Sequence, residues 1–320
     1  MYRRRFFLFI FCLFIFKIIY AREVIILYTG STEACLYPSY PARNLIGGVS
    51  RRSTLINQIR KNNPHTILLD AGNSFAKPES KEANVDLSLY KLRTQINLKA
   101  MKIMQYDAVN IGIEEFNLGE DFLIENLKNS SLLFTSCNLI LSEPQILHPY
   151  VIKEVAGIKF GIVGVTNLSA MDKAKEIRFQ DPFRALKNTV SKIKKDVDFI
   201  IVLSSLGEYH DRRIIQEIKE IDIIINGGFR ENKDSYSKLD NVILLRCSMK
   251  GAYLGKLTLN IKDKRIQSFK VEEIPLSEKI KDDSQINSFL PSCFFDNDCK
   301  KEGMLGLCQN PGTPQAQCLF

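Results

Sequence analysis

The stretch from Val24 to Ile59, VIILYTGSTEACLYPSYPARNLIGGVSRRSTLINQI, carries the clearest structural signal in the chain. Its first part, Val24 to Tyr28, is an apolar run that predicts a buried strand. A polar loop follows, and the pair Gly47 and Gly48 leads into an amphipathic segment that predicts a helix. Because α/β proteins place their chemistry where a strand ends in a loop that leads to a helix, this loop is the first candidate for a site. Cys35 is its most reactive side chain.

The amino terminus predicts export. Arg3 to Arg5 precede an apolar run from Phe6 to Phe16, and Lys17 and the small residue Ala21 follow. These are the features of a secretory signal peptide, so residues 1–21 are predicted to be one. An uncleaved membrane anchor is the alternative, but Lys17 ends the apolar run well short of the roughly 18 residues that a spanning helix needs. We therefore expect a protein of the periplasm or the extracellular space.

Charge and composition limit the possible partners. The formal charge of +8 falls to +4 when the four basic residues of the signal segment are removed. A modest excess of this kind, spread along the chain, is not typical of nucleic-acid binding. We expect no nucleic acid as a partner and, once the signal segment is cleaved, no membrane. The length of 320 residues and the 45% apolar content indicate one large domain with an appendage.

Beyond the first helix, the hydrophobic pattern alternates between the periods of strands and helices. The predicted strands are Thr66–Leu69, Tyr106–Gly112, Leu132–Ser136, Tyr150–Val155, Ile158–Thr166, Asp198–Leu203, Asp222–Ile225, Val242–Arg246, Tyr253–Ile261 and Ile266–Glu273, and the predicted helices are Asp86–Met104, Asp181–Lys195 and Arg212–Lys219. This order predicts two β-sheets packed face to face with helices outside. The hairpin formed by Tyr150–Val155 and Ile158–Thr166 is expected to close one sheet and lead into the second half. The predicted domains are residues 22–275 and a Cys-rich tail, residues 276–320.

Short stretches throughout this unit match one known family in order. They are Ile26–Thr29, Gly47–Arg52, Thr54–Ile56, Leu68–Gly72, Tyr106–Val109, Gly112, Glu115, Phe116, Gly119, Gly161–Thr166, Leu203, Ser204, Leu206, Gly207, Asp222–Gly228 and Gly251–Leu257. The chain resembles the 5'-nucleotidase/UDP-sugar hydrolase family of exported calcineurin-like metallophosphoesterases. The resemblance implies an α/β fold, a four-layer αββα sandwich, to which this chain adds a small Cys-rich C-terminal module.

The chain departs from this family at the positions that hold metal ions or catalyse. The resemblance implies Asp, Asn and His ligands for two metal ions there, and a His that acts as the catalytic acid. In this chain the degenerate positions are Ser31, Glu33, Asn73, Ile113, Glu114, Ser205, Phe229 and Glu231. A two-metal phosphoesterase needs imidazoles and carboxylates that converge on both ions. The three histidines of the chain, His65, His148 and His210, lie elsewhere. The sequence therefore predicts that metal-dependent phosphohydrolase activity is lost and that no cofactor is bound.

Three carboxylates at these positions leave another reading open. Glu33, Glu114 and Glu231 replace histidines, and together with the neighbouring Ser and Asn side chains they could hold a hard ion such as Ca²⁺ or Mg²⁺. The alternative is that they are separated and solvated, or paired with Arg51 and Arg230. Residual hydrolase activity at such a site is the third of our functional hypotheses.

The first hypothesis is a non-hydrolytic binding or accessory protein that uses the former active-site cleft to hold a small ligand or a periplasmic protein. The second is a thiol-dependent redox protein centred on Cys35, because the chain also resembles exported relatives with Cys or selenocysteine in this loop. A redox thiol needs a nearby cation or helix N-terminus and a second thiol, for which Cys137 is the best candidate. A structural Cys35–Cys137 disulfide, or an inert thiol, is the alternative.

The remaining cysteines are predicted to have structural roles, not catalytic ones. Cys247 lies in a predicted strand, where a buried thiol is typically a small hydrophobic residue. The tail contains Cys293, Cys299, Cys308 and Cys318 among turn-forming residues. Too small for a core of its own, it is expected to need two disulfides, and four cysteines allow three pairings. No Cys-x-x-Cys motif occurs, so a zinc site is less expected. Such a module is typically a structural or partner-binding cap.

Overall fold

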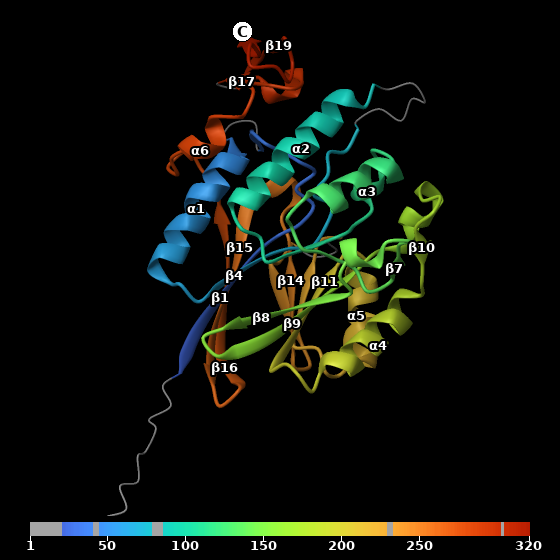
Figure 1. Ribbon diagram of the computed structural model, residues 1–320. Coiled ribbons are helices and arrows are strands. Elements are labelled where there is room, and N and C mark those ends of the chain that lie inside the picture. The colour runs from blue at the N-terminus through green and yellow to red at the C-terminus, as the bar shows by residue number, and fades with distance from the viewer. Residues whose placement is uncertain (1–20, 41–44, 79–85, 229–232, 302–303) are drawn as a thin grey trace, which may run out of the picture.

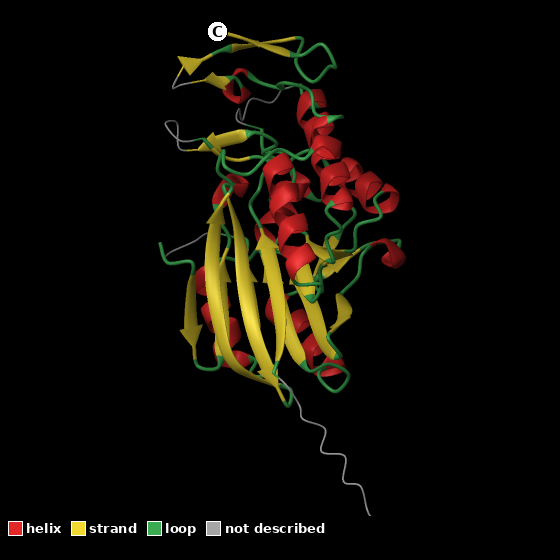
Figure 2. Cartoon of the chain, turned by 90° about the vertical axis from the view of Figure 1, so that its left-hand side faces the viewer, coloured by secondary structure: helices red, strands yellow, loops and turns green. Residues whose placement is uncertain are grey.

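The computed structural model describes residues 21–40, 45–78, 86–228, 233–301 and 304–320 (Figure 1). The predicted signal segment, apart from Ala21, and the positions Phe229 and Glu231 lie outside these residues. Two six-stranded sheets form the centre of the molecule, and helices cover them on both sides (Figures 1 and 2).

The first sheet has the strand order β16-β15-β1-β4-β5-β6. Its strands are β1 (Arg22–Thr29), β4 (Thr66–Asp70), β5 (Ala108–Asn110), β6 (Phe134–Thr135), β15 (Tyr253–Lys262) and β16 (Arg265–Pro275). β1, β4, β5 and β6 run parallel, whereas β15 returns from the end of the chain and pairs antiparallel with β1. Gly255 lies opposite Tyr28 in this pairing, because the Tyr28 ring occupies the space of a side chain there. The outer face is covered by α1 (Val49–Asn62), α2 (Ser88–Ile103) and α3 (Glu120–Asn129).

The second sheet has the order β13-β14-β12-β11-β9-β8. Its strands are β8 (Tyr150–Val155), β9 (Ile158–Val165), β11 (Phe199–Ser204), β12 (Ile223–Asn226), β13 (Tyr236–Leu239) and β14 (Val242–Arg246), and α4 (Pro182–Ile193) and α5 (Glu208–Glu217) pack on its outer side. The hairpin β8–β9 was predicted to close one sheet and lead into the next. This was wrong, because both strands belong to the second sheet, with β8 at its edge.

Three hydrophobic layers confirm the αββα sandwich. In β1, Val24, Ile26 and Tyr28 pack between the two sheets, while Ile25 and Leu27 pack against the helices of the first layer. Both faces of this strand are therefore buried, as its continuous apolar run predicts. A third cluster fills the space between the second sheet and its helices.

Two helices depart from the sequence prediction, and both begin at a glycine with a positive φ. α3 was not predicted, and it follows Gly119, whose φ is 95°. α5 begins at Glu208, ahead of the predicted Arg212, directly after Gly207 with φ 92°. Because glycine adopts this conformation without steric cost, the chain can turn sharply from loop into helix at these points. By contrast, Asp181 caps α4 as expected, and its carboxylate accepts a hydrogen bond from the Arg184 N–H at 2.8 Å.

The shorter elements lie in the connections and the tail. They are β2 (Pro38–Tyr40), β3 (Ile46–Gly47), β7 (Leu139–Ile140), β10 (Arg178–Phe179), β17 (Lys300–Lys301), β18 (Met304–Leu305), β19 (Leu307–Gln309), β20 (Gln317–Leu319), α6 (Ser284–Asn287) and the 3₁₀ helices η1 (Glu114–Phe116), η2 (Pro144–Ile146), η3 (Leu168–Lys173), η4 (Met249–Gly251) and η5 (Asp296–Asp298). No helix among the described residues is long and apolar enough to cross a membrane.

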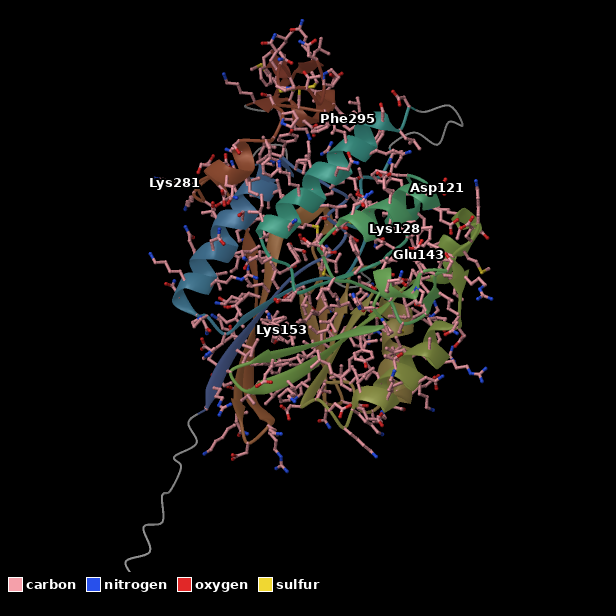
Figure 3. The ribbon with its side chains drawn as sticks, viewed as in Figure 1. Asp121, Lys128, Glu143, Lys153, Lys281 and Phe295 are labelled. Carbon is pink, nitrogen blue, oxygen red and sulfur yellow. A yellow bond between two sulfur atoms is a disulfide. The ribbon has the colours of Figure 1, made fainter. Side chains whose placement is uncertain are left out.

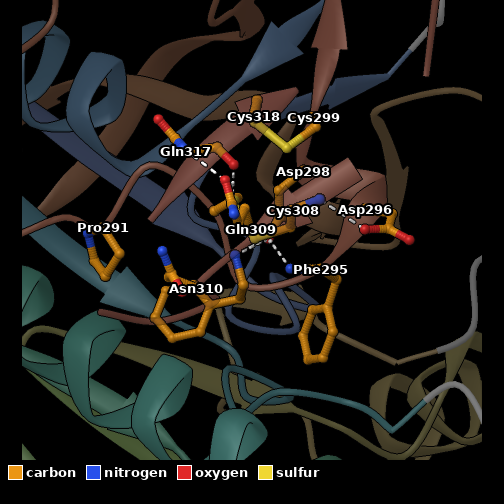
Figure 4. The surroundings of a disulfide bond; sticks show 12 residues. Pro291, Phe295, Asp296, Asp298, Cys299, Cys308, Gln309, Asn310, Gln317 and Cys318 are labelled. Atoms are coloured by element: carbon orange, nitrogen blue, oxygen red, sulfur yellow. Dashed lines mark hydrogen bonds between the residues drawn. A yellow bond between two sulfur atoms is a disulfide. The ribbon is translucent and has the colours of Figure 1, made fainter. Parts of the chain in front are cut away.

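The tail is held by two disulfides, Cys293–Cys308 and Cys299–Cys318 (Figure 4). The chain leading to it packs on the core: Leu276 and Ile286 belong to the cluster under the first-layer helices. The Tyr37 hydroxyl donates to the Pro291 carbonyl at 2.5 Å. The tail itself projects beyond the helices of the first layer (Figure 2).

Candidate functional site

Loops at the carboxyl ends of both sheets bring several of the degenerate positions together. Ser31 follows β1, Asn73 follows β4 and Gly227 follows β12. The Ser31 hydroxyl donates to the Gly227 carbonyl at 2.5 Å, and Nδ2 of Asn73 donates to the same carbonyl at 2.9 Å. Ser31 and Asn73 therefore lie side by side at the Gly227 carbonyl.

The side chains of Asn73 and Ser205 also form hydrogen bonds with backbone groups of neighbouring loops. Oδ1 of Asn73 accepts from the N–H groups of Ile113 at 2.8 Å and Glu114 at 3.1 Å. The buried hydroxyl of Ser205 lies 3.2 Å from the Val165 carbonyl and accepts from the Asn167 N–H at 3.2 Å. Each of these side chains therefore connects loops to one another.

Glycines let these loops approach at backbone distance. A Cβ at Gly227 would lie 2.6 Å from the Ala71 carbonyl oxygen, and one at Gly72 would lie 2.9 Å from the Gly112 nitrogen. A Cβ at Gly112 would overlap Oδ1 of Asn73. The loops after β4, β5 and β12 are thus packed directly against one another.

The buried side chain of Glu115 also binds these loops. It was not singled out as a site residue from the sequence. Its carboxylate accepts from the N–H groups of Ser74 at 2.5 Å, Gly112 at 2.7 Å and Asn73 at 3.0 Å. Burial raises the pKa of Glu115 to about 7. Its partners are all backbone or neighbouring loop groups, which assigns it a structural role.

The described residues do not fit the pair of metal ions that this fold implies. The Ser31 hydroxyl and the Asn73 amide donate hydrogen bonds to a carbonyl, and the Ile113 side chain has no atom that could bind a metal ion. Within the described ranges, one group of three His, Cys, Asp or Glu side chains has its ligand atoms close enough for one ion, namely Cys293, Cys299 and Cys318. All three are in disulfides.

Two of the described residues, Glu33 and Glu114, stand where the resemblance implies histidines. Glu114 forms an ion pair with Lys77 at 2.9 Å and accepts from the Asn117 amide. Of the two arginines predicted as alternative partners, Arg51 pairs with Asp282 at 3.8 Å, and Arg230 lies outside the described residues together with Glu231. Burial raises the pKa of Glu33 above its ordinary value.

An open pocket of about 330 Å³ lies beside these loops. Its principal lining residues are Glu33, Cys35, Lys77, Tyr90, Arg93, Lys250 and Phe295. They come from the loops after β1 and β4, from α2, from η4 and from the tail. Of its three cations, Lys77 is paired with Glu114 and Arg93 with Asp298, so most of the positive charge of the lining is balanced. Sequence reasoning found only Glu33 and Cys35 of this set, because the other residues are far apart along the chain and form no local motif.

The tail completes one wall of the pocket. The rings of Tyr90 and Phe295 pack with centroids 4.7 Å apart, where the tail meets α2 (Figure 3). Arg93 pairs with Asp298 of the tail at 3.2 Å and donates from Nε to the Ala34 carbonyl at 2.8 Å. Arg93 therefore links α2, the tail and the loop that carries Cys35.

Cys35, Cys137 and Cys247, the cysteines outside the tail that the structure describes, remain thiols. Cys35 and Cys137 are not joined, so the alternative of a disulfide between them was wrong. Burial raises the pKa of Cys35, although Arg93 opposes this effect, and burial raises the pKa of Cys137 to about 12. Cys137 packs beside the helices of the second sheet, away from the pocket lining. Cys247 is buried between the sheets, as predicted.

A buried acid next to the site loops should make stability depend on pH. Asp211 accepts a hydrogen bond from the Ser204 hydroxyl at 2.5 Å and another from the Asn226 amide, and burial raises its pKa to about 7. A raised folded-state pKa means that the folded protein binds more protons than the unfolded chain between about pH 4 and pH 7. The free energy of unfolding should therefore fall as the pH rises across this window, by on the order of 4 kcal/mol from this group.

We expect Asp211→Asn to flatten this fall in urea titrations of the protein at pH 4, 5.5 and 7. Oδ1 of Asn226 has no hydrogen-bond partner among the described residues. If the Asn226 amide flips, this oxygen can accept a hydrogen bond from the NH₂ group of the asparagine introduced at position 211. An equally steep loss of stability in the variant would show that Asp211 is not the group responsible.

Comparisons with known proteins agree with this architecture. No protein-family model matches the chain. It is 27% identical over 260 residues to the trifunctional nucleotide phosphoesterase protein YfkN of Bacillus subtilis, which is 68% of this chain and 17% of that protein. It is 31% identical over 197 residues to the 5'-nucleotidase of Bos taurus, which is 58% of this chain and 33% of that protein.

The structure of a 5'-nucleotidase precursor from Thermus thermophilus superposes with a TM-score of 0.72 at 23% identity, covering 83% of this chain and 57% of that one. The chain thus spans a third or less of the length of these two curated relatives and somewhat more than half of the solved structure.

Proposed function

Because the chain is a 5'-nucleotidase-like protein with the calcineurin-like metallophosphoesterase fold, we propose that it is an exported binding or accessory protein that no longer hydrolyses phosphate esters with two metal ions. The hydrogen bonds at the former ligand positions carry this proposal. Ser31 and Asn73 both donate to the Gly227 carbonyl. An Asn side chain binds a metal ion through Oδ1, and that oxygen of Asn73 already accepts from the N–H groups of Ile113 and Glu114.

The pocket beside Cys35 is the proposed binding site, and a small anion is its proposed ligand. Lys77, Arg93 and Lys250 line it, with Glu33 as the one carboxylate. Because Lys77 and Arg93 are paired with Glu114 and Asp298, Lys250 is the cation on which the proposed attraction for an anion mainly rests.

The test combines turnover and binding. Purified protein supplied with Zn²⁺, Mn²⁺ or Mg²⁺ should not hydrolyse p-nitrophenyl phosphate, and calorimetry should detect pyrophosphate binding. Lys250→Met should weaken that binding roughly fivefold, because a partly exposed cation contributes about 1 kcal/mol. Lys194→Met is the matched control, since Lys194 is an exposed lysine on the far side of the second sheet that pairs with Glu220.

Metal-dependent turnover would overturn the proposal and favour the residual-hydrolase hypothesis. Equal losses in the Lys250 and Lys194 variants would show that pyrophosphate does not bind in the pocket.

The alternative proposal is a redox function of Cys35, which is favoured by its position in the pocket lining. Its raised pKa weighs against it, because a redox thiol reacts as the thiolate. Rapid alkylation of Cys35 at pH 7, slowed by bound pyrophosphate, would favour this alternative over simple binding.

A further inference from the structure

The two disulfides of the tail lie next to each other. Cys308 and Cys318 are directly opposite in the antiparallel β19–β20 pair, yet each is bonded to a different partner, Cys293 and Cys299 respectively (Figure 4). Side chains that are opposite in such a pair lie on one face of the hairpin and within reach of each other. The strand pairing therefore brings all four sulfur atoms to one place.

The distances between the sulfur atoms agree with this placement. Those of Cys293, Cys299 and Cys318 all lie within 4.8 Å of one another, although Cys293 is bonded to neither of the other two. The sulfur of Cys308 is bonded to that of Cys293 and completes the set. Four thiolates around a tetrahedral Zn²⁺ ion, each about 2.3 Å from it, are about 3.8 Å apart. Once the S–S bonds are opened, small shifts of the side chains are enough to reach this arrangement.

The surroundings of the sulfur atoms resemble a closed structural metal site. Cys293 and Cys299 are 0% exposed, and Cys308 and Cys318 pack against them in the core of the tail. Structural zinc sites are closed in the same way, with four protein ligands and no open position. Thiolate sulfur is a ligand that selects zinc over hard ions such as Mg²⁺ and Ca²⁺.

Backbone hydrogen bonds hold the same segments together independently of the disulfides. The Gly306 N–H donates to the Cys299 carbonyl at 2.8 Å, and the Gly312 N–H donates to the Cys293 carbonyl at 2.9 Å. The sequence made a zinc site less expected because no Cys-x-x-Cys motif occurs. Such a motif is not needed here, since strand pairing and these contacts bring together cysteines that are far apart in the chain.

We propose that the reduced tail binds one Zn²⁺ ion through Cys293, Cys299, Cys308 and Cys318, so that the metal ion takes the place of the two disulfides. Two molecules of a dithiol pass four electrons and four protons to the two disulfides and become disulfides themselves. The four cysteine thiols then release four protons as four zinc–sulfur bonds form.

The bound ion would preserve the pocket wall that the tail provides. A segment too small for a core of its own stays folded only when it is cross-linked or holds a metal ion. In the reduced protein, zinc would therefore keep Phe295 at Tyr90 and Asp298 at Arg93. The proposal does not depend on what the pocket binds.

Titration of the full protein with Co²⁺, a spectroscopic substitute for Zn²⁺, tests the proposal. The protein reduced with a phosphine should bind one Co²⁺ ion with the absorption of a tetrahedral thiolate site, and Zn²⁺ should displace it, whereas the oxidised protein should show no such absorption. Cys318→Ser should weaken binding about a hundredfold or more, because loss of a ligand costs more than loss of an outer partner. The matched control is Cys137→Ser, which removes a thiol outside the tail and should leave binding unchanged.

Alkylation of the reduced wild-type protein tests the site without any variant. One equivalent of Zn²⁺ should slow alkylation of the four tail cysteines about tenfold or more, because the metal ion occupies the thiolates that would react. A chelator should restore the rate, and Cys35 should react equally fast with or without the ion. Failure of the reduced protein to bind Co²⁺, equal binding by the oxidised protein or by Cys318→Ser, or protection of Cys35 instead of the tail would overturn the proposal.

Discussion

Arg246→Met should lower the free energy of unfolding by about 3 kcal/mol, the cost of removing the buried one of the two arginines that pair with the buried carboxylate of Glu208. Arg246 and Glu208 are both 0% exposed at the side chain, and Nη2 and Nε of the arginine lie 2.5 and 2.8 Å from the two carboxylate oxygens. The same guanidinium donates to the Ser237 hydroxyl at 2.8 Å. Methionine would fill a similar volume and satisfy none of these acceptors. Chemical denaturation of the oxidised protein measures the loss.

Two further variants identify the cause. Arg213→Met removes an exposed i,i+4 pair with Glu217 and should cost less than about 0.5 kcal/mol. Arg246→Met combined with Glu208→Met removes both buried charges and should recover most of the lost stability. A double variant as unstable as the single one would mean that packing around Arg246, and not the lost ion pair with Glu208, determines the loss.

Gly164→Ala should lower the free energy of unfolding by roughly 3 kcal/mol or more, because the two sheets meet at this residue without room for a side chain. A Cβ there would lie 2.5 Å from Oδ1 of Asn110 and closer still to the Thr135 carbonyl oxygen. Asn110 is itself fixed, since its amide donates to the carbonyls of Ala71 at 3.1 Å and Val165 at 3.2 Å. Asn110 therefore cannot move away from the added Cβ without breaking these two hydrogen bonds. The midpoint of thermal or urea unfolding should fall accordingly.

Gly161→Ala is a matched control in the same strand. A Cβ at Gly161 would meet the end of the Ile193 side chain and two Val197 methyl groups, which can shift, so we expect a cost of about 1 kcal/mol or less. If both variants lost the same stability, strand propensity and not the approach of the two sheets would explain the effect.

Much of the fold could be predicted because its signals are local and repeated. The apolar run of β1 and the alternation of strands and helices predicted a sandwich, and the three hydrophobic layers confirm it. The starts of α3 and α5 were missed because Gly119 and Gly207 look like loop residues until their positive φ values are known. The sheet to which β8 belongs depends on long-range pairing, which no local pattern encodes.

The candidate site was only partly accessible from sequence. Resemblance to a family was sufficient to locate Ser31 and Asn73, since the positions of metal ligands are fixed by motifs. The pocket could not be located in this way, because Lys77, Arg93 and Phe295 come from three separate segments. The pairing of Cys293 with Cys308 and of Cys299 with Cys318 was likewise one of three possibilities that spacing alone does not distinguish.

The place of β1 in the middle of the first sheet has a consequence for biosynthesis. Its neighbour on one side, β4, follows soon after in the chain, but its other neighbour is β15, which begins at Tyr253. During translation one edge of this very apolar strand stays without a partner until most of the polypeptide has been made. Such an edge is prone to aggregation, so the nascent chain should depend on a chaperone to shield it until β15 arrives.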